Sequence, residues 1–225
     1  MKKGILIIIF VGFSSILLGQ EYEIGIFAGG SNYIGDIGRT NYIYPNKPAG
    51  AVFFKYNKNP RIAFRATYSF LPISGNDLDA DTDFKRNRAL NFSNTIHELA
   101  VGIEYNFYEY DLSTPGKTWT PYITLDLAAY NYKYVTSEPQ PNQFLYDTKN
   151  AITVPFGVGF KSKLIGPIAF AIETKFRYSL NDDLDYTTET IPNLNFGGTS
   201  NDWYTFTGIS LIYTFGRPPC YTTGF

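Results

Sequence analysis

Apolar and polar residues alternate along most of this chain, in short segments that turns or loops separate. In one such segment, 61–70, a single face carries Ile62, Phe64, Ala66, Tyr68 and Phe70. Successive side chains of a strand point to opposite faces, whereas a helical period would scatter these apolar positions around the axis. The pattern therefore predicts β-strands.

Eight segments follow this pattern, at residues 23–33, 51–57, 61–70, 95–107, 120–132, 151–161, 168–178 and 203–215. The connections are long at 34–49, 71–93, 134–150 and 180–201, intermediate at 108–119, and short at 58–60 and 162–166. Long outer loops that alternate with short periplasmic turns are typical of outer-membrane barrels. We therefore predict an all-β fold, an eight-stranded antiparallel up-and-down transmembrane β-barrel. An even number of strands would place both termini in the periplasm.

A soluble β-sandwich is the alternative architecture for eight such strands. Here the apolar face of the strands is bulky and aliphatic, and the opposite face is rich in glycine and in small or charged side chains. The interior of a narrow barrel needs residues of that kind, because eight strands leave little room inside. This favours the membrane barrel, with outer-membrane lipid as its surroundings.

The inward face is expected to hold five basic and four acidic side chains. The basic ones are Lys55, Arg65, Lys161, Lys175 and Arg177, and the acidic ones are Glu98, Glu104, Asp126 and Glu173. Charges held away from bulk water are expected to pair. A polar channel is the alternative use of such residues, but the small lumen favours a network of ion pairs that plugs the barrel.

The two ends of the chain differ in character from the strands. A positive start, an apolar run from Ile5 to Leu18 and a small Gly19 predict a signal peptide over 1–20. The barrel is then expected over 21–216 and a periplasmic C-terminal tail over 217–225. The chain contains one cysteine, so an internal disulfide framework is not expected.

Composition and motifs give no support for catalysis or for nucleic-acid binding. The net charge is −1, which offers no basic footprint for nucleic acid, and no GxSxG motif occurs. His97, the one histidine, is expected to point outward near the outer end of its strand. The alternating aspartates of NDLDADTDF lack the glycine and the final carboxylate of a calcium loop. These aspartates, and Asp182, Asp183 and Asp185, are therefore expected to be solvated, and no catalytic, cofactor or metal residues are predicted.

The tail carries the candidate partner-binding residues. These are Arg217, Pro218, Pro219, Cys220 and Tyr221. A Pro-Pro pair favours an extended, stiff conformation, which would project the following thiol and aromatic ring away from the barrel. An unpaired cysteine in an exported protein indicates either an intermolecular disulfide or a free thiol. Contact with a partner and a tail without contacts both remain open.

Three strings carry a resemblance to a known family. They are GGSNYIGDIG at 29–38, ELAVGIEYNFYEYDL at 98–112 and NDWYTFTGISLIYTFGRPPCY at 201–221. Together they resemble the PorG family of the type IX secretion system of Bacteroidetes. The resemblance implies a non-enzymatic outer-membrane barrel that holds a periplasmic ring, made of a PorK/GldK-like lipoprotein and a PorN/GldN-like protein, against the outer membrane. It also implies a role in protein export and in gliding motility where it occurs.

One position departs from that family, in which a second cysteine commonly follows two residues after the first. Here that position is Thr222, so a cysteine pair within the tail is not available. A surface barrel that binds ligands or other cells through its long outer loops is the alternative function.

Overall fold

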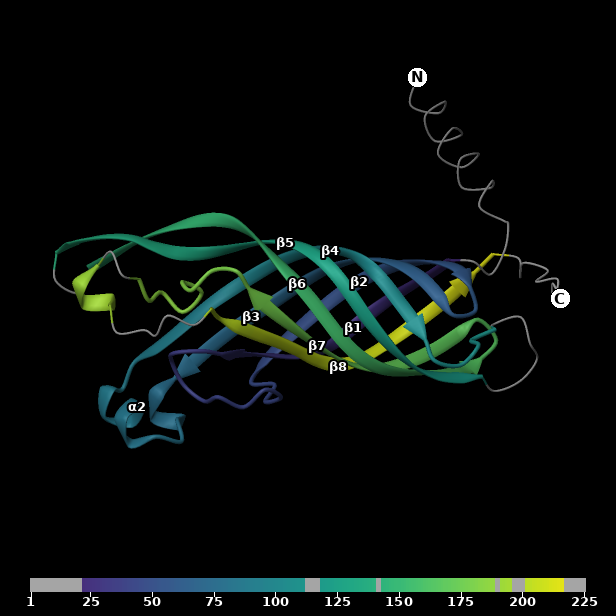
Figure 1. Ribbon diagram of the computed structural model, residues 1–225, viewed down its shortest axis with the longest axis horizontal. Coiled ribbons are helices and arrows are strands. Elements are labelled where there is room, and N and C mark those ends of the chain that lie inside the picture. Colours follow the sequence, from purple (N-terminus) through teal and green to yellow (C-terminus); the bar gives the residue numbers. More distant parts are fainter. Residues whose placement is uncertain (1–21, 112–117, 141–142, 189–190, 196–200, 217–225) are drawn as a thin grey trace, which may run out of the picture.

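Eight antiparallel strands close into a barrel in which each strand pairs with its neighbours in the sequence and β1 pairs with β8 (Figure 1). The computed structural model describes residues 22–111, 118–140, 143–188, 191–195 and 201–216. The strands are β1 Tyr22–Ile34, β2 Lys47–Asn59, β3 Ile62–Asn76, β4 Asn91–Asn106, β5 Trp119–Gln140, β6 Gln143–Ile165, β7 Ile168–Ser179 and β8 Trp203–Phe215. Within the described connections lie three short helices, η1 Asp77–Asp79, α2 Asp83–Arg88 and η2 Pro192–Leu194. The predicted fold class is confirmed.

The two ends of the barrel are unequal. At one end, called here the terminal end, β1 begins beside the last residue of β8, since Tyr22 pairs with Phe215. At the other, called here the loop end, lie the three short helices and the tip of the β5–β6 hairpin (Figure 1). The connections between strands therefore lie alternately at the two ends of the barrel, as the alternation of loop lengths predicts.

One predicted loop is wrong. Residues 134–150 were expected to form a long connection, but β5 extends to Gln140 and β6 begins at Gln143. The two strands remain paired as far as Gln140 and Gln143, with register shifts at Ser137. The irregular register explains the error, because a shift breaks the strict alternation from which strands are read. The barrel therefore carries a hairpin that projects beyond its wall.

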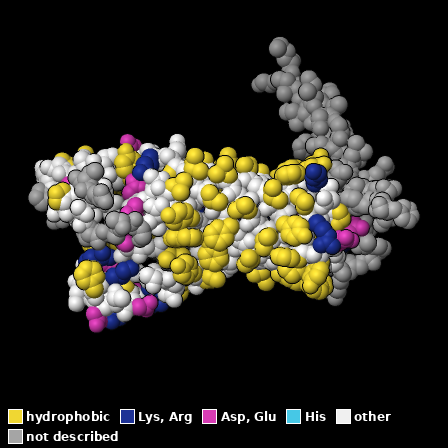
Figure 2. All heavy atoms as spheres, in the orientation of Figure 1, with side chains coloured by type: hydrophobic (Ala, Val, Ile, Leu, Met, Phe, Trp, Pro, Cys, Tyr) yellow, Lys and Arg dark blue, Asp and Glu magenta, His cyan; other side chains and the backbone are white. Residues whose placement is uncertain are grey.

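The wall of the barrel is apolar on the outside. Large apolar side chains point outward from every strand, and they form a band across the face shown in Figure 2. Near the terminal end, ring contacts join Tyr22, Phe54, Tyr56, Phe64 and Phe215. An apolar band bounded by aromatic side chains is the surface that a bilayer requires of a spanning barrel. Among the residues that the structure describes, no helix is long and apolar enough to span a bilayer.

Large aromatic side chains fill much of the interior, in addition to the small and charged residues expected there. Phe27, Phe53, Tyr122, Tyr130, Tyr204 and Phe206 are all buried. Glycines make room for two of these rings: a Cβ at Gly25 would lie 2.2 Å from the Phe53 ring, and one at Gly159 would lie 2.4 Å from the Tyr122 ring. These two glycines are therefore sites where large neighbouring rings fit, and not empty space.

Candidate functional site

The inward charges form a connected network in the barrel interior. The Glu104 carboxylate forms an ion pair with the Lys55 ammonium at 2.6 Å and accepts a hydrogen bond from Lys161 at 2.5 Å, and all three side chains are fully buried. Further along the barrel, Arg65 binds Glu173 at 2.6 Å, Lys175 binds Asp126 at 2.5 Å, and Arg177 binds Glu98 at 2.9 Å. The charges pair as predicted. A charge removed from water is tolerated only with such partners.

The sequence-based set of inward charges lacks one member. Glu23, at the start of β1, is 1% exposed, and its carboxylate lies 3.5 Å from the ammonium of Lys55. It also accepts a hydrogen bond from Asn57 at 3.0 Å. With Glu23 the described network has five basic and five acidic side chains, and its formal charge is zero. The strand pattern contained the signal, because Glu23 precedes the outward Ile24 and therefore faces inward.

The terminal end of the interior is covered by a tyrosine. Tyr110, from the connection between β4 and β5, is 5% exposed, and the Lys161 ammonium lies 4.4 Å from the centre of its ring. The backbone N–H of Tyr110 donates to the carbonyl of Pro60 in the neighbouring turn, which fixes the connection there. The described interior is thus filled by ion pairs and covered from this side.

The sequence predicts that Asp77 is solvated, but the structure buries it at the loop end. Its carboxylate accepts from Arg88 Nε at 2.7 Å and from the backbone N–H groups of Gly38 and Leu90. Burial disfavours its charge, but these hydrogen bonds and the Arg88 guanidinium hold the pKa of Asp77 below its usual value. Asp77 therefore fastens the β3–β4 connection to the β1–β2 connection.

Asp185 is also buried, again contrary to the prediction of a solvated acidic loop. It shares the hydroxyl of Tyr33 with Asp202: the Tyr33 oxygen lies 2.8 Å from Asp185 Oδ2 and in short contact with Asp202 Oδ1. Burial raises the pKa of Asp185. Burial, together with the negative charge of Asp185, raises the pKa of Asp202 to about 9. These two carboxyl groups hold the β7–β8 connection on the end of β1.

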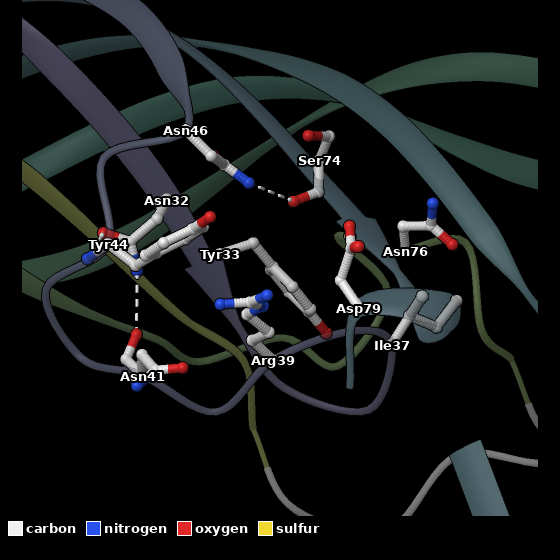
Figure 3. A pocket seen from close by; sticks show the side chains of 11 residues that line it. Asn32, Tyr33, Ile37, Arg39, Asn41, Tyr44, Asn46, Ser74, Asn76 and Asp79 are labelled. Atoms are coloured by element: carbon white, nitrogen blue, oxygen red, sulfur yellow. Dashed lines mark hydrogen bonds between the residues drawn. The ribbon is translucent and has the colours of Figure 1, made fainter. Parts of the chain in front are cut away.

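A small polar pocket opens beside this cluster (Figure 3). It has a volume of about 30 Å³ and lies between the β1–β2 connection and the end of β3. Its polar wall includes Asn32, Arg39, Asn41, Asn46, Ser74, Asn76 and Asp79. The Arg39 guanidinium lies 4.8 Å from the centre of the Tyr44 ring, and Asn32 donates to the carbonyl of Asn41 at 3.1 Å. This pocket was not predicted from the sequence, because contacts between distant loops bring its residues together.

The other candidate residues are placed as follows. His97 points outward as predicted, and its ring nitrogen Nδ1 lies 2.9 Å from the hydroxyl of Tyr68 on the neighbouring strand. In the described part of the chain, no three His, Cys, Asp or Glu side chains are grouped so that they could hold a metal ion. The tail residues Arg217, Pro218, Pro219, Cys220 and Tyr221 lie outside the described residues, so their role stays a prediction.

Solved structures with a similar arrangement are small outer-membrane barrels. The N-terminal β-barrel domain of Pseudomonas aeruginosa OprF is 14% identical, with coverage of 85% of this chain and 97% of that chain and a TM-score of 0.45. Neisserial surface protein A is 9% identical, with coverage of 87% and 97% and a TM-score of 0.49. Ail of Yersinia pestis, in complex with the heparin analogue sucrose octasulfate, is 12% identical, with coverage of 85% and 97% and a TM-score of 0.45.

The level of identity in these pairs does not carry an activity from one protein to another. No curated protein matches the sequence. A family model does match it, over residues 2–224, which is almost the whole chain. The chain therefore belongs to the family described as Domain of unknown function (DUF6089).

Proposed function

We propose that this protein is a non-enzymatic outer-membrane barrel that acts as an anchor. The observation that carries this proposal is the combination of an apolar wall with a filled interior. The wall suits lipid on all sides, and Lys55, Glu104 and Lys161 in the interior are fully buried. A barrel of this kind holds a fixed position in the membrane and offers its two ends for contacts, whereas a transport channel needs hydrated inward charges.

The anchored assembly is that of the type IX secretion system. In this proposal the protein fixes a periplasmic ring of a PorK/GldK-like lipoprotein and a PorN/GldN-like protein to the outer membrane, and so supports protein export and gliding motility. Support comes from the resemblance of the strings at 29–38, 98–112 and 201–221 to the PorG family. The terminal end faces the periplasm in this proposal, and the tail from Arg217 to Tyr221 extends from it.

The test is purification of the ring from membranes without reductant. Strains with the full chain, with a chain that ends at Gly216 and with Cys220→Ser would be compared for recovery of the two ring proteins. We expect the truncated chain to insert normally and to recover less ring, because the barrel is complete at Phe215. Equal ring recovery from all three strains would contradict the role of the tail. Recovery of no ring by the full chain would contradict the anchoring function itself.

Binding of a ligand at the cell surface is the second candidate function. The loop end favours it, because buried hydrogen bonds there hold the loops in one arrangement around a polar pocket. Removal of the β5–β6 projection or of the α2 segment would then abolish function, whereas loss of residues 217–225 would not. The two candidate functions therefore predict opposite outcomes for loop and tail deletions.

A further inference from the structure

The polar pocket at the loop end contains an arginine whose hydrogen-bonding capacity is largely unused. Arg39 Nε is buried and has no hydrogen-bond partner. Within the described residues the guanidinium forms no ion pair, and it lies over the ring of Tyr44. A buried donor without an acceptor is costly and uncommon in native proteins. Arg39 is therefore placed to bind an acceptor that enters the pocket.

The opposite charge in the wall is Asp79. This residue is exposed at the end of η1, and in the described structure it forms no ion pair. Figure 3 shows Arg39 and Asp79 in the wall of the same small space. The wall thus carries one positive and one negative side chain, which do not form an ion pair with each other. A ligand that complements both must carry one negative and one positive group.

We propose that this pocket binds a small zwitterion, with its carboxylate against Arg39 and its ammonium against Asp79. This is the chemistry of a free α-amino acid, and it goes beyond the anchoring function. A guanidinium presents a planar fork of donors that matches the two oxygens of a carboxylate. The pocket volume of about 30 Å³ holds about two water-sized groups, which is the size of a carboxylate. The rest of the ligand would extend toward Asp79, which is an exposed residue of the wall.

Other occupants fit the wall less well. A phosphate carries a second negative charge, which would oppose Asp79. A simple cation would oppose Arg39, which already lies over the Tyr44 ring. Water could accept the hydrogen bond of Arg39 Nε, but a pocket that holds only water would bind none of the added solutes. These occupants become the comparison arms of the test.

The experiment measures calorimetric binding of four probes to the purified full chain in detergent micelles. The probes are glycine, acetate, methylamine and inorganic phosphate, at one pH and ionic strength. We expect saturable binding in the order glycine, then acetate, with weaker binding of methylamine and phosphate. Arg39→Lys keeps the charge but removes the fork, and should weaken glycine binding by about tenfold. Asp79→Asn should reduce the preference for glycine over acetate and leave acetate binding at least as strong.

The matched control is Arg61→Lys, since Arg61 lies in a turn at the terminal end, where its guanidinium meets Glu109 at 3.5 Å. This variant should bind glycine as the parent chain does. Absence of saturable glycine binding would mean that the pocket holds water only and would overturn the proposal. Equal binding of glycine and acetate that Asp79→Asn leaves unchanged would contradict the proposal that the ligand is a zwitterion. Because Asp79 is exposed, its variant tests the site even if the Arg39 variant disturbs the loop.

Discussion

The carboxyl pair at the loop end should make the stability of the protein depend on pH. Tyr33 is in contact with both Asp185 and Asp202 through one hydroxyl oxygen. A phenol has one proton and can donate to only one carboxylate, so the second contact needs a proton on the other carboxyl group. Asp202 is 1% exposed, and burial raises its pKa to about 9 from an ordinary value of 3.8. The folded protein should therefore retain this proton at neutral pH.

The sign and the size of the effect follow from the proton balance. Between the unfolded pKa of Asp202, 3.8, and the folded pKa of about 9, the folded state binds one more proton than the unfolded state. The free energy of unfolding should then fall by about 1.4 kcal/mol for each unit of pH increase in that window. The stabilisation is fully present below the unfolded pKa and is lost as the pH rises to the folded pKa. Above about pH 9 this contribution to the slope should disappear.

The assay is urea unfolding of the barrel in detergent micelles at several values between pH 6 and pH 9. Trp203, which follows Asp202 directly, is one of two tryptophans and reports on the loop end through its fluorescence. Asp202→Asn should remove most of the slope, because an amide can fill the same place but does not titrate. Asp83→Asn is the control, since Asp83 is exposed on α2. Parallel slopes for the parent chain and Asp202→Asn would refute the shared proton.

Three further predictions concern the barrel itself. Glu104→Gln should lower the free energy of unfolding by about 3–5 kcal/mol, because it removes the negative charge that the buried Lys55 and Lys161 share. Urea unfolding measures this change, with Glu109→Gln at an exposed position as the control. Gly208→Ala should lower the free energy of unfolding by about 1–3 kcal/mol, because its Cβ would lie 2.3 Å from a backbone oxygen of β1. Gly50→Ala is the control: the nearest neighbour of its Cβ is 3.6 Å away, so it should fold like the parent chain in a gel-shift assay. The parent protein should produce no stable conductance steps in planar bilayers, and regular steps would contradict the filled interior.

Local alternation was sufficient to predict the fold. The segment 203–215 places Ile209, Leu211, Tyr213 and Phe215 on one face, and its predicted bounds are those of β8. Burial on one face specifies such a strand, because a slip of one residue would turn its apolar set inward. Where the barrel wall ends, that constraint weakens. The β5–β6 hairpin extends past the wall with an irregular register, and the same rules read it as a loop.

The loop end could not be predicted, because its structure depends on pairs far apart in the sequence. Asp202 meets Tyr33 across 169 positions, and Asp77 meets Gly38 across 39. Nothing in the neighbouring residues marks Asp77 or Asp185 as buried, and aspartates in a polar stretch are ordinarily solvated. Arg39 was missed for the same reason, since three separate segments form the wall of its pocket.

The two proposed activities lie at opposite ends of one closed barrel. Backbone pairing around the whole ring and ion pairs across the described interior lie between the two ends, and Lys55, Glu104 and Lys161 there are fully buried. A change at the tail should therefore leave zwitterion binding intact, and Arg39→Lys should leave ring recovery intact. If either variant altered the activity at the other end, the two ends would be coupled. Such coupling would require the interior packing of the barrel to change, and the ion pairs of Glu104 would then be broken in one of the two states.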